Sequence, residues 1–392
     1  MAIRDANRKR ALAVVFSSAL AAAGLLAACT LLNPLDDYTN GVRADGGLDA
    51  TSDVGPLGDG GSNPCALRLP PERPTTGEGS GPPLTLALAN IAFDSEAGFL
   101  GYDLDRQCTC QGGTTSCTNP KASTASTCDL PNGVDNSGST LYRTLANQAR
   151  IAGYNLDPAG PIKRGRATIL LRLSDWNGTP NDATVVLGLV YSFGTDGSQD
   201  AGSSFWSEEA GTVPPKGDGN DAWTYDPDSL PNGTPRVEDR AAYVRDGVLV
   251  GRFSSFALAL GVVRFVVQDV VLTGKLVAFP GGGAQITDGI IQGRDGAEDM
   301  LTQFQLFRSP VFPYNPLCRD DQTYKVVETQ ICSALDVRKA PGDDNKGLPC
   351  EAVSIGFNFQ AIPAKLGPAY PPPPREAPCD DPDAGPWVGR CP

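Results

Sequence analysis

Two short segments of the chain place carboxylate and amide oxygens beside glycine, the composition of a loop that binds a hard cation such as Ca²⁺. They span residues 133–138 and 218–221, and the side chains that would act as ligands are Asp135, Asn136, Asp218 and Asn220. A similar segment spans 343–347. None has the ligand spacing of an EF-hand loop, because the twelfth position counted from Asp135 is Ala146 rather than Glu. Asp, Asn and Gly also build ordinary turns, so a calcium site and a simple turn stay open as alternatives.

A second kind of chemistry is carbohydrate recognition by aromatic side chains. The candidate ligand-binding residues are Trp206, Trp223 and Tyr225, which lie in a segment rich in Gly, Asp, Asn, Pro and Ser. We expect this segment, residues 194–235, to form a long loop. Exposed aromatic rings beside Asp and Asn stack on sugars and leave their hydroxyls to hydrogen-bond with the polar groups. The alternative is that the tryptophans pack in the core beneath the loop.

Catalysis is restricted by the absence of histidine from the whole sequence, which excludes Ser-His-Asp and Cys-His mechanisms and every histidine-ligated metal site. Glycoside hydrolysis needs only two carboxylates, and Glu208, Glu209, Asp226 and Asp228 lie beside the aromatic residues. Neighbouring acids more often form a solvated loop face. The glycines at 281–283 lack the Lys-Ser/Thr of a phosphate-binding loop. We therefore assign no catalytic residue.

The sequence has eleven cysteines, an odd number, but an even number is left for disulfides if Cys29 carries another modification. The other ten are the disulfide candidates Cys65, Cys108, Cys110, Cys117, Cys128, Cys318, Cys332, Cys350, Cys379 and Cys391. Thiols outside the cytosol pair readily. The alternative is a zinc site around Cys108 and Cys110, although their spacing is not that of a Cys-x-x-Cys knuckle. The count favours disulfides, and it leaves their connectivity open.

The N-terminus has the features of an export signal. Four basic residues among the first ten precede an uncharged apolar stretch at 11–28. The stretch ends in Leu26-Ala27-Ala28-Cys29, which resembles the lipobox of bacterial lipoproteins. The resemblance implies cleavage before Cys29 and a diacylglycerol on its thiol. The alternative is an ordinary signal peptide in which Cys29 has no role.

A lipobox implies attachment to the cell envelope through acyl chains. Thr30, rather than Asp, follows the cysteine, which by analogy with Gram-negative lipoproteins favours the outer membrane. Removing residues 1–28 changes the formal net charge from −13 to about −16. A chain this acidic is repelled by an anionic bilayer and by nucleic acid, so we expect the lipid to provide the membrane contact and expect no nucleic-acid partner.

Residues 29–83 are rich in Gly, Pro and Asp and show no apolar periodicity, which predicts a disordered tether. Residues 84–367 carry the strand and helix patterns of a folded domain, and residues 368–392 form a Pro- and Cys-rich tail. Apolar alternation or Val/Leu-rich runs predict strands at 84–91, 167–173, 182–193, 241–244, 248–253, 256–260, 262–267, 270–279, 284–292 and 353–359. Helical spacing predicts helices at 141–151, 298–307 and 323–337. An Asn-Gly pair at 177–178 predicts a hairpin.

Short strands joined by Gly- and Pro-rich turns indicate a mainly β fold. We expect an antiparallel β-sandwich or jelly-roll-like body with a few short helices and long loops tied by disulfides. Residues 101–110, 128–136 and 171–178 together resemble a group of Cys-rich exported lipoproteins of myxobacteria. The resemblance implies an extracytoplasmic β-rich domain and implies no activity.

These observations predict a lipid-anchored envelope protein with a non-catalytic binding or structural domain. The expected partners are the membrane, through the lipid, and either a glycan or another envelope protein. The alternatives are a carboxylate-dependent polysaccharide hydrolase and an envelope scaffold or adhesin. Calcium is the one cofactor that the sequence puts forward.

Overall fold

The computed structural model describes residues 67–77, 79–93, 101–111, 115–122, 128–151, 157–196, 213–260, 263–306, 316–319, 321–371, 379 and 388–391. These residues belong to the second of two compact units, Ser62–Pro392. The lipobox, Cys65, Trp206, Glu208 and Glu209 lie outside the described residues. Among the described helices, none has the length and apolar character needed to span a membrane.

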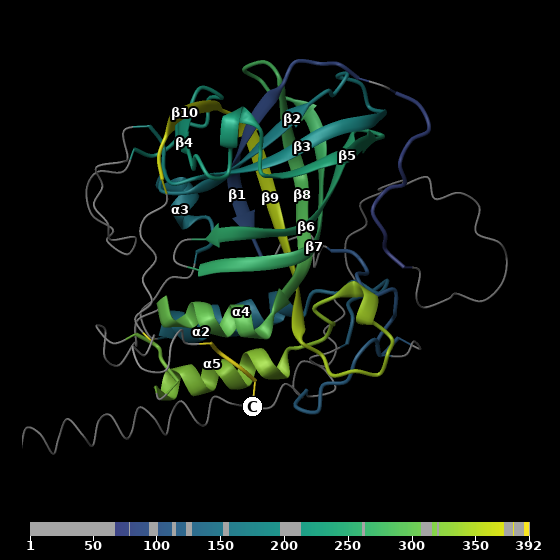
Figure 1. Cartoon of the computed structure of the whole chain (residues 1–392), viewed down its shortest axis with the longest axis vertical. Helices are drawn as coiled ribbons and strands as arrows, with labels where there is room; N and C mark the ends of the chain where they lie inside the picture. Colours follow the sequence, from purple (N-terminus) through teal and green to yellow (C-terminus); the bar gives the residue numbers. More distant parts are fainter. Residues whose placement is uncertain are drawn as a thin grey trace, which may run out of the picture. The chain divides into compact units, whose positions relative to one another are not determined.

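Eight strands, each antiparallel to its neighbours, close into a barrel (Figure 1). Their order around the barrel is β1-β2-β3-β5-β6-β7-β8-β9, and pairing of β9 with β1 closes it. The strands are β1 (Leu84–Ala92), β2 (Thr168–Ser174), β3 (Asp182–Ser192), β5 (Val237–Arg245), β6 (Val248–Leu260), β7 (Val263–Ala278), β8 (Ala284–Gly296) and β9 (Ala352–Pro363).

The mainly β class predicted from the sequence is confirmed, but the strands form a closed barrel rather than a sandwich or jelly roll. Alternation specifies that one face of each strand is buried, and both architectures meet that requirement. The difference lies in β1, which pairs with β2 on one side and with β9 on the other. Register shifts between β3 and β5, β7 and β8, and β8 and β9 bend the sheet, as closure requires.

The barrel interior is a filled apolar core. In β2, Ile169, Leu171 and Leu173 belong to the interior cluster, whereas Leu170 belongs to a separate cluster outside the barrel. Strand alternation therefore gives β2 two apolar faces. Interior side chains from the other strands include Leu86, Leu187, Val244, Phe253, Leu272, Ile291, Phe357 and Phe359.

Three helices pack together below one end of the barrel (Figure 1): α2 (Ser137–Ile151), α4 (Ala297–Gln303) and α5 (Gln322–Ser333). Asp321 caps α5 by accepting hydrogen bonds from the Thr323 and Tyr324 amides. Tyr324, Val327 and Ile331 follow at helical spacing and face a second apolar core. All three helices were predicted, with ends that differ by a few residues from those observed.

The remaining elements are short. They are α3 (Gly160–Lys163), the 3₁₀ turns η2 (Pro231–Gly233), η3 (Phe304–Leu306) and η4 (Pro341–Asp343), and a parallel pair, β4 (Ala222–Tyr225) with β10 (Lys365–Ala369). The sequence analysis missed β4 and β10. A four-residue strand inside a Gly- and Asp-rich segment has too few residues to show alternation.

Ordered contacts begin ahead of residue 84, within the segment expected to be tether. The Arg73 guanidinium donates to the Ala183 carbonyl at 3.1 Å and lies 5.0 Å above the Tyr243 ring. The Tyr243 hydroxyl in turn donates to the Pro71 carbonyl. Extended segments held by such single contacts carry no apolar period for sequence analysis to detect.

Four disulfides join described cysteines: Cys110–Cys128, Cys117–Cys350, Cys318–Cys379 and Cys332–Cys391. Cys108 is also disulfide-bonded, so all nine described cysteines are oxidised. The disulfide framework predicted from the cysteine count is therefore present, and the alternative zinc site at Cys108 and Cys110 is excluded.

Disulfides that close longer loops should stabilise the fold more. Cys117–Cys350 spans 233 residues and Cys110–Cys128 spans 18. By chain entropy, replacing the first pair with alanines should lower the free energy of unfolding by about 5 kcal/mol, and replacing the second by about 3 kcal/mol. Urea denaturation of the two double variants measures the difference. An equal or larger loss for the short-loop variant would contradict the entropic account.

Candidate functional site

Three buried aspartates form a cluster on the outside of the barrel, which we call the carboxylate cluster: Asp103, Asp105 and Asp135. One oxygen from each lies within 4.8 Å of those of the other two. The side chains are 5%, 4% and 1% exposed, respectively. Asp103 and Asp105 lie in residues 101–111, and Asp135 lies in the turn that leads into α2.

A barrel side chain joins these two segments. Gln292 in β8 is fully buried, accepts a hydrogen bond from the Tyr102 amide, and donates to the Tyr102 carbonyl at 2.8 Å and to the Asp135 carbonyl at 2.5 Å. The Asp135 amide also donates to the Tyr102 carbonyl, at 3.1 Å. A side chain at Gly101 would not fit, because its Cβ would lie 2.8 Å from Val134 Cγ1 and 3.1 Å from Gln292 Oε1. Gln292 therefore fixes the relative position of the aspartates.

Tyr102 attaches the first segment to the outer face of the barrel. Its ring packs with Val271 and Ile290, and its hydroxyl hydrogen-bonds to Thr273 Oγ1 at 2.9 Å. The aspartates on either side of Leu104 thus lie against a rigid sheet rather than in a free loop.

Each carboxylate of the cluster is oriented by backbone amides through one oxygen only. Asp135 Oδ2 accepts from Leu104 N at 2.6 Å and from Asp105 N at 3.3 Å. Asp105 Oδ1 accepts from Gln107 N at 2.8 Å, and Asp103 Oδ1 accepts from Arg106 N. The second oxygens, Asp103 Oδ2, Asp105 Oδ2 and Asp135 Oδ1, are shielded from solvent and accept no hydrogen bond from the described residues.

Burial disfavours the ionised form of these acids. It raises the pKa of Asp103 to about 7 and the pKa of Asp135 well above the usual aspartate range, with repulsion from Asp105 adding to both shifts. Burial likewise raises the pKa of Asp105, although the nearby Arg294 charge lowers it, and burial raises the pKa of two neighbouring acids, Asp129 to about 8 and Asp336 to about 6.

Arg294 is the buried cation beside the cluster, and both of its terminal nitrogens are already engaged. Its guanidinium makes two hydrogen bonds to Asp344, at 2.9 and 2.8 Å, and donates to the Leu104 carbonyl at 2.8 Å and to the Arg338 carbonyl at 2.9 Å. Its side chain is 0% exposed. Arg294 is therefore shared between Asp344 and the cluster, and it donates no hydrogen bond to the three unpartnered oxygens.

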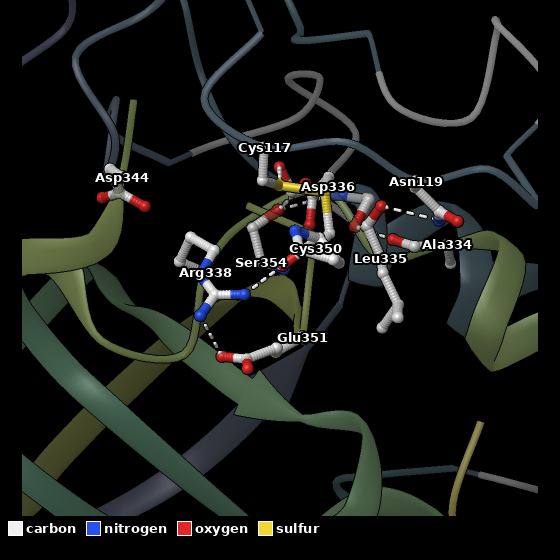
Figure 2. Close-up of a disulfide and its surroundings, with 12 residues drawn as sticks. Cys117, Asn119, Ala334, Leu335, Asp336, Arg338, Asp344, Cys350, Glu351 and Ser354 are labelled. Carbon is white, nitrogen blue, oxygen red and sulfur yellow. Dashed lines mark hydrogen bonds and ion pairs between the residues drawn. A yellow bond between two sulfur atoms is a disulfide. The ribbon is translucent and has the colours of Figure 1, made fainter. Parts of the chain in front are cut away.

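The loops that enclose the cluster are fastened to the barrel and to α5 beside the Cys117–Cys350 disulfide (Figure 2). Asn119 Nδ2 donates to the Leu335 carbonyl at 2.9 Å and to the Cys332 carbonyl at 3.0 Å, at the C-terminal end of α5. Asp336 accepts hydrogen bonds from the Ser354 amide and hydroxyl in β9. Arg338 pairs with Glu351 at 3.0 Å.

The sequence-predicted cation ligands separate in the structure. Asp135 lies in the cluster, but Asn136 does not act there, because its Oδ1 accepts from Gly356 N at 3.0 Å and from Ser139 N at 3.2 Å, which joins α2 to β9. Asp218 and Asn220 form an exposed turn in which Asn220 N donates to Asp218 Oδ1 at 2.8 Å. This segment therefore forms the simple turn that the sequence analysis gave as the alternative to a calcium site.

The segment 343–347 also carries no open ligand set, because its acids are paired. Asp343 forms an ion pair with Lys346 at 2.8 Å, and Asp344 is bound by Arg294. Asp103, Asp105 and Gln292 were not predicted as site residues. The Asp-x-Asp spacing beside a Cys-rich stretch is the signal that could have identified the first two, whereas the sequence around Gln292 carries no such signal.

Trp223 takes the core position that the sequence analysis gave as the alternative to a sugar platform. It is 2% exposed and packs with Ala87, Leu170, Val190 and Leu230 on the outside of the barrel. Its ring is therefore inaccessible to a glycan. Tyr225 is half-buried against the same cluster, and Trp206 lies outside the described residues.

The candidate catalytic acids are not brought into a described active site. Asp226 is buried, and its Oδ1 accepts from Asp228 N at 2.9 Å within a turn. Glu208 and Glu209 lie outside the described residues. The Asp226 carboxylate is therefore used in local structure.

Comparison with known proteins gives no relative: no family model, curated protein or solved structure matches the chain.

Replacing Trp223 should destabilise the domain. Trp223→Ala removes a buried indole between the β4–β10 pair and the barrel, and urea denaturation should show a loss of about 3–5 kcal/mol in unfolding free energy. Leu366→Ala is the matched control, because Leu366 pairs with Trp223 in register but is 38% exposed. Similar losses in the two variants would contradict the assignment of Trp223 to the core.

Asp295 provides a pH test separate from the carboxylate cluster. It is fully buried at the α4 end of β8, neither carboxylate oxygen accepts a hydrogen bond from the described residues, and burial raises its pKa well above the usual range. The native state therefore retains a proton that the unfolded state loses above about pH 4. The unfolding free energy should fall as pH rises toward the native pKa, by about 1.4 kcal/mol per pH unit.

Asp295→Asn is neutral at every pH and should lack this contribution. The stability of the variant relative to the parent chain should therefore increase between about pH 5 and about pH 8, as measured by urea denaturation at several pH values. Asp218→Asn, in an exposed turn, serves as the control and should show no such trend. Parallel pH profiles for Asp295→Asn and the parent chain would refute the buried protonated state.

Proposed function

We propose that the chain is a lipid-anchored envelope protein whose barrel is a non-catalytic binding or structural domain. The observation that carries the proposal is the cysteine count of the fold. Four described pairs use eight cysteines, and Cys108 is bonded as well. Only Cys29 and Cys65 lie outside the described residues, so a disulfide from Cys108 within the chain uses one of them and leaves the other.

The cysteine that is left without a disulfide partner is available for lipidation. Cys29 ends the Leu26-Ala27-Ala28-Cys29 motif, so it is the residue expected to carry the acyl chains, and Cys65 is then the partner of Cys108. Oxidation of every described cysteine fits a compartment outside the cytosol. Two or more acyl chains provide stable membrane attachment without help from the acidic polypeptide.

The absence of an accessible reaction centre among the described residues supports a non-catalytic role. Their carboxylate cluster is sealed from solvent, and apolar side chains of the described strands pack in the barrel interior. A pocket of about 230 Å³, lined by residues of β1, α3, the segment 215–223 and the end of β9, is smaller than most small-molecule sites. In this proposal the partner, a glycan or another envelope protein, meets the outer surface.

Two cysteine variants test the anchor. Cys29→Ser should move the protein from the membrane fraction to the soluble fraction, because the acylated thiol is lost. Cys65→Ser should stay in the membrane and expose one reactive thiol, on Cys108. Fractionation followed by thiol labelling under denaturing conditions measures both outcomes. Membrane retention of Cys29→Ser, or release of Cys65→Ser with no new thiol, would refute the proposal.

A further inference from the structure

We propose that the carboxylate cluster is a divalent-cation site, with Asp103, Asp105 and Asp135 as the protein ligands and Ca²⁺ as the preferred ion. The inference is independent of lipid anchoring. It extends the sequence-level hypothesis for Asp135 to residues that the sequence analysis did not assign.

The spacing of the oxygens suits calcium. Ca²⁺ binds oxygen ligands at about 2.3–2.6 Å, so two ligands of one ion are separated by up to about 5 Å. The three carboxylate oxygens lie within 4.8 Å of one another. Mg²⁺ binds at about 2.0–2.1 Å in a stricter octahedron and fits oxygens that lie closer together. Zn²⁺ is disfavoured because the neighbouring cysteines, Cys108 and Cys110, are oxidised and provide no thiolate.

The state of the second oxygens is an independent observation that points to a ligand. Asp103 Oδ2, Asp105 Oδ2 and Asp135 Oδ1 belong to side chains at least nine-tenths buried, and none accepts a hydrogen bond from the described residues. Burying such groups without a partner is costly. Backbone amides hold the other oxygen of each side chain, so the ligand oxygens are oriented before an ion arrives.

Gly133 keeps space beside the cluster. A Cβ at this position would lie 3.2 Å from Asp103 Oδ2 and 3.0 Å from the Gln107 carbonyl oxygen, and the backbone has φ +67°. The remaining coordination positions of Ca²⁺ would be filled by water.

A bound cation would add a further cross-link between two segments that backbone hydrogen bonds, the Asp135 side chain, Gln292 and the Cys110–Cys128 disulfide already hold together. Asp103 and Asp105 follow β1, whereas Asp135 precedes α2. Binding should therefore stabilise the loops that enclose the cluster as well as neutralise its charge.

Calorimetric titration of the mature protein, purified with a chelator and then freed of it, tests the site. We expect one Ca²⁺ per chain, a higher Tm in the presence of calcium, and weaker binding of Mg²⁺. Asp135→Asn and Asp105→Asn should each weaken calcium binding by at least about 100-fold. Asp218→Asn is the matched control, an aspartate in an exposed Gly- and Asn-rich turn, and should leave the affinity within about twofold.

Folding of each variant is checked by circular dichroism and by the absence of free thiols. If a cluster variant fails to fold, the titration of the parent chain still decides the question. No calcium binding by the folded parent chain at millimolar concentration would overturn the proposal. So would calcium binding that survives both cluster variants and is lost in Asp218→Asn. Membrane attachment of Cys29 variants is measured separately, so the two proposals fail independently.

Discussion

Burial of acidic groups is the constraint on which the loops that enclose the carboxylate cluster depend. Three carboxylates are held within 4.8 Å of one another where solvent does not reach, and Asp129 and Asp336 add to the same field. Like charges at this spacing in a low dielectric repel by several kcal/mol unless protons or a cation offset them. Arg294 offsets this repulsion only in part, because its guanidinium also pairs with Asp344 and Asp269.

The barrel supplies the rigid frame against which this charge is assembled. Along β8, Ile291 faces the interior, whereas Gln292 and Arg294 face outward and are buried beneath loops. Gln292 binds the segments that carry the cluster, and Arg294 binds the Leu104 and Arg338 carbonyls on the two sides of the loops that enclose the cluster. Loops bury little apolar surface, so disulfides such as Cys117–Cys350 replace the stability that a larger core would provide.

Sequence patterns predicted the elements well and their assembly poorly. Alternation and Val/Leu-rich runs located the eight barrel strands, although β6 and β7 were each predicted as two shorter strands. The Asn-Gly pair at 177–178 marked the β2–β3 hairpin. Closure depends on pairing between β1 and β9, at opposite ends of the folded chain, which local patterns do not encode. The candidate site shows the same limit. Asp135 could be identified from its own turn, but its position beside Asp103 depends on Gln292, which binds Tyr102 from 190 residues away. Sequence analysis left Trp223 open between a sugar platform and the core, because a polar loop surrounds it in sequence, while apolar residues of β1, β2 and β3 surround it in space.

A crystal structure of the mature protein grown with calcium tests the central claim most directly. The account predicts a single density peak within about 2.3–2.6 Å of Asp103 Oδ2, Asp105 Oδ2 and Asp135 Oδ1. Density that shows the three side chains hydrogen-bonded to one another as protonated acids, with no ion between them, would contradict it.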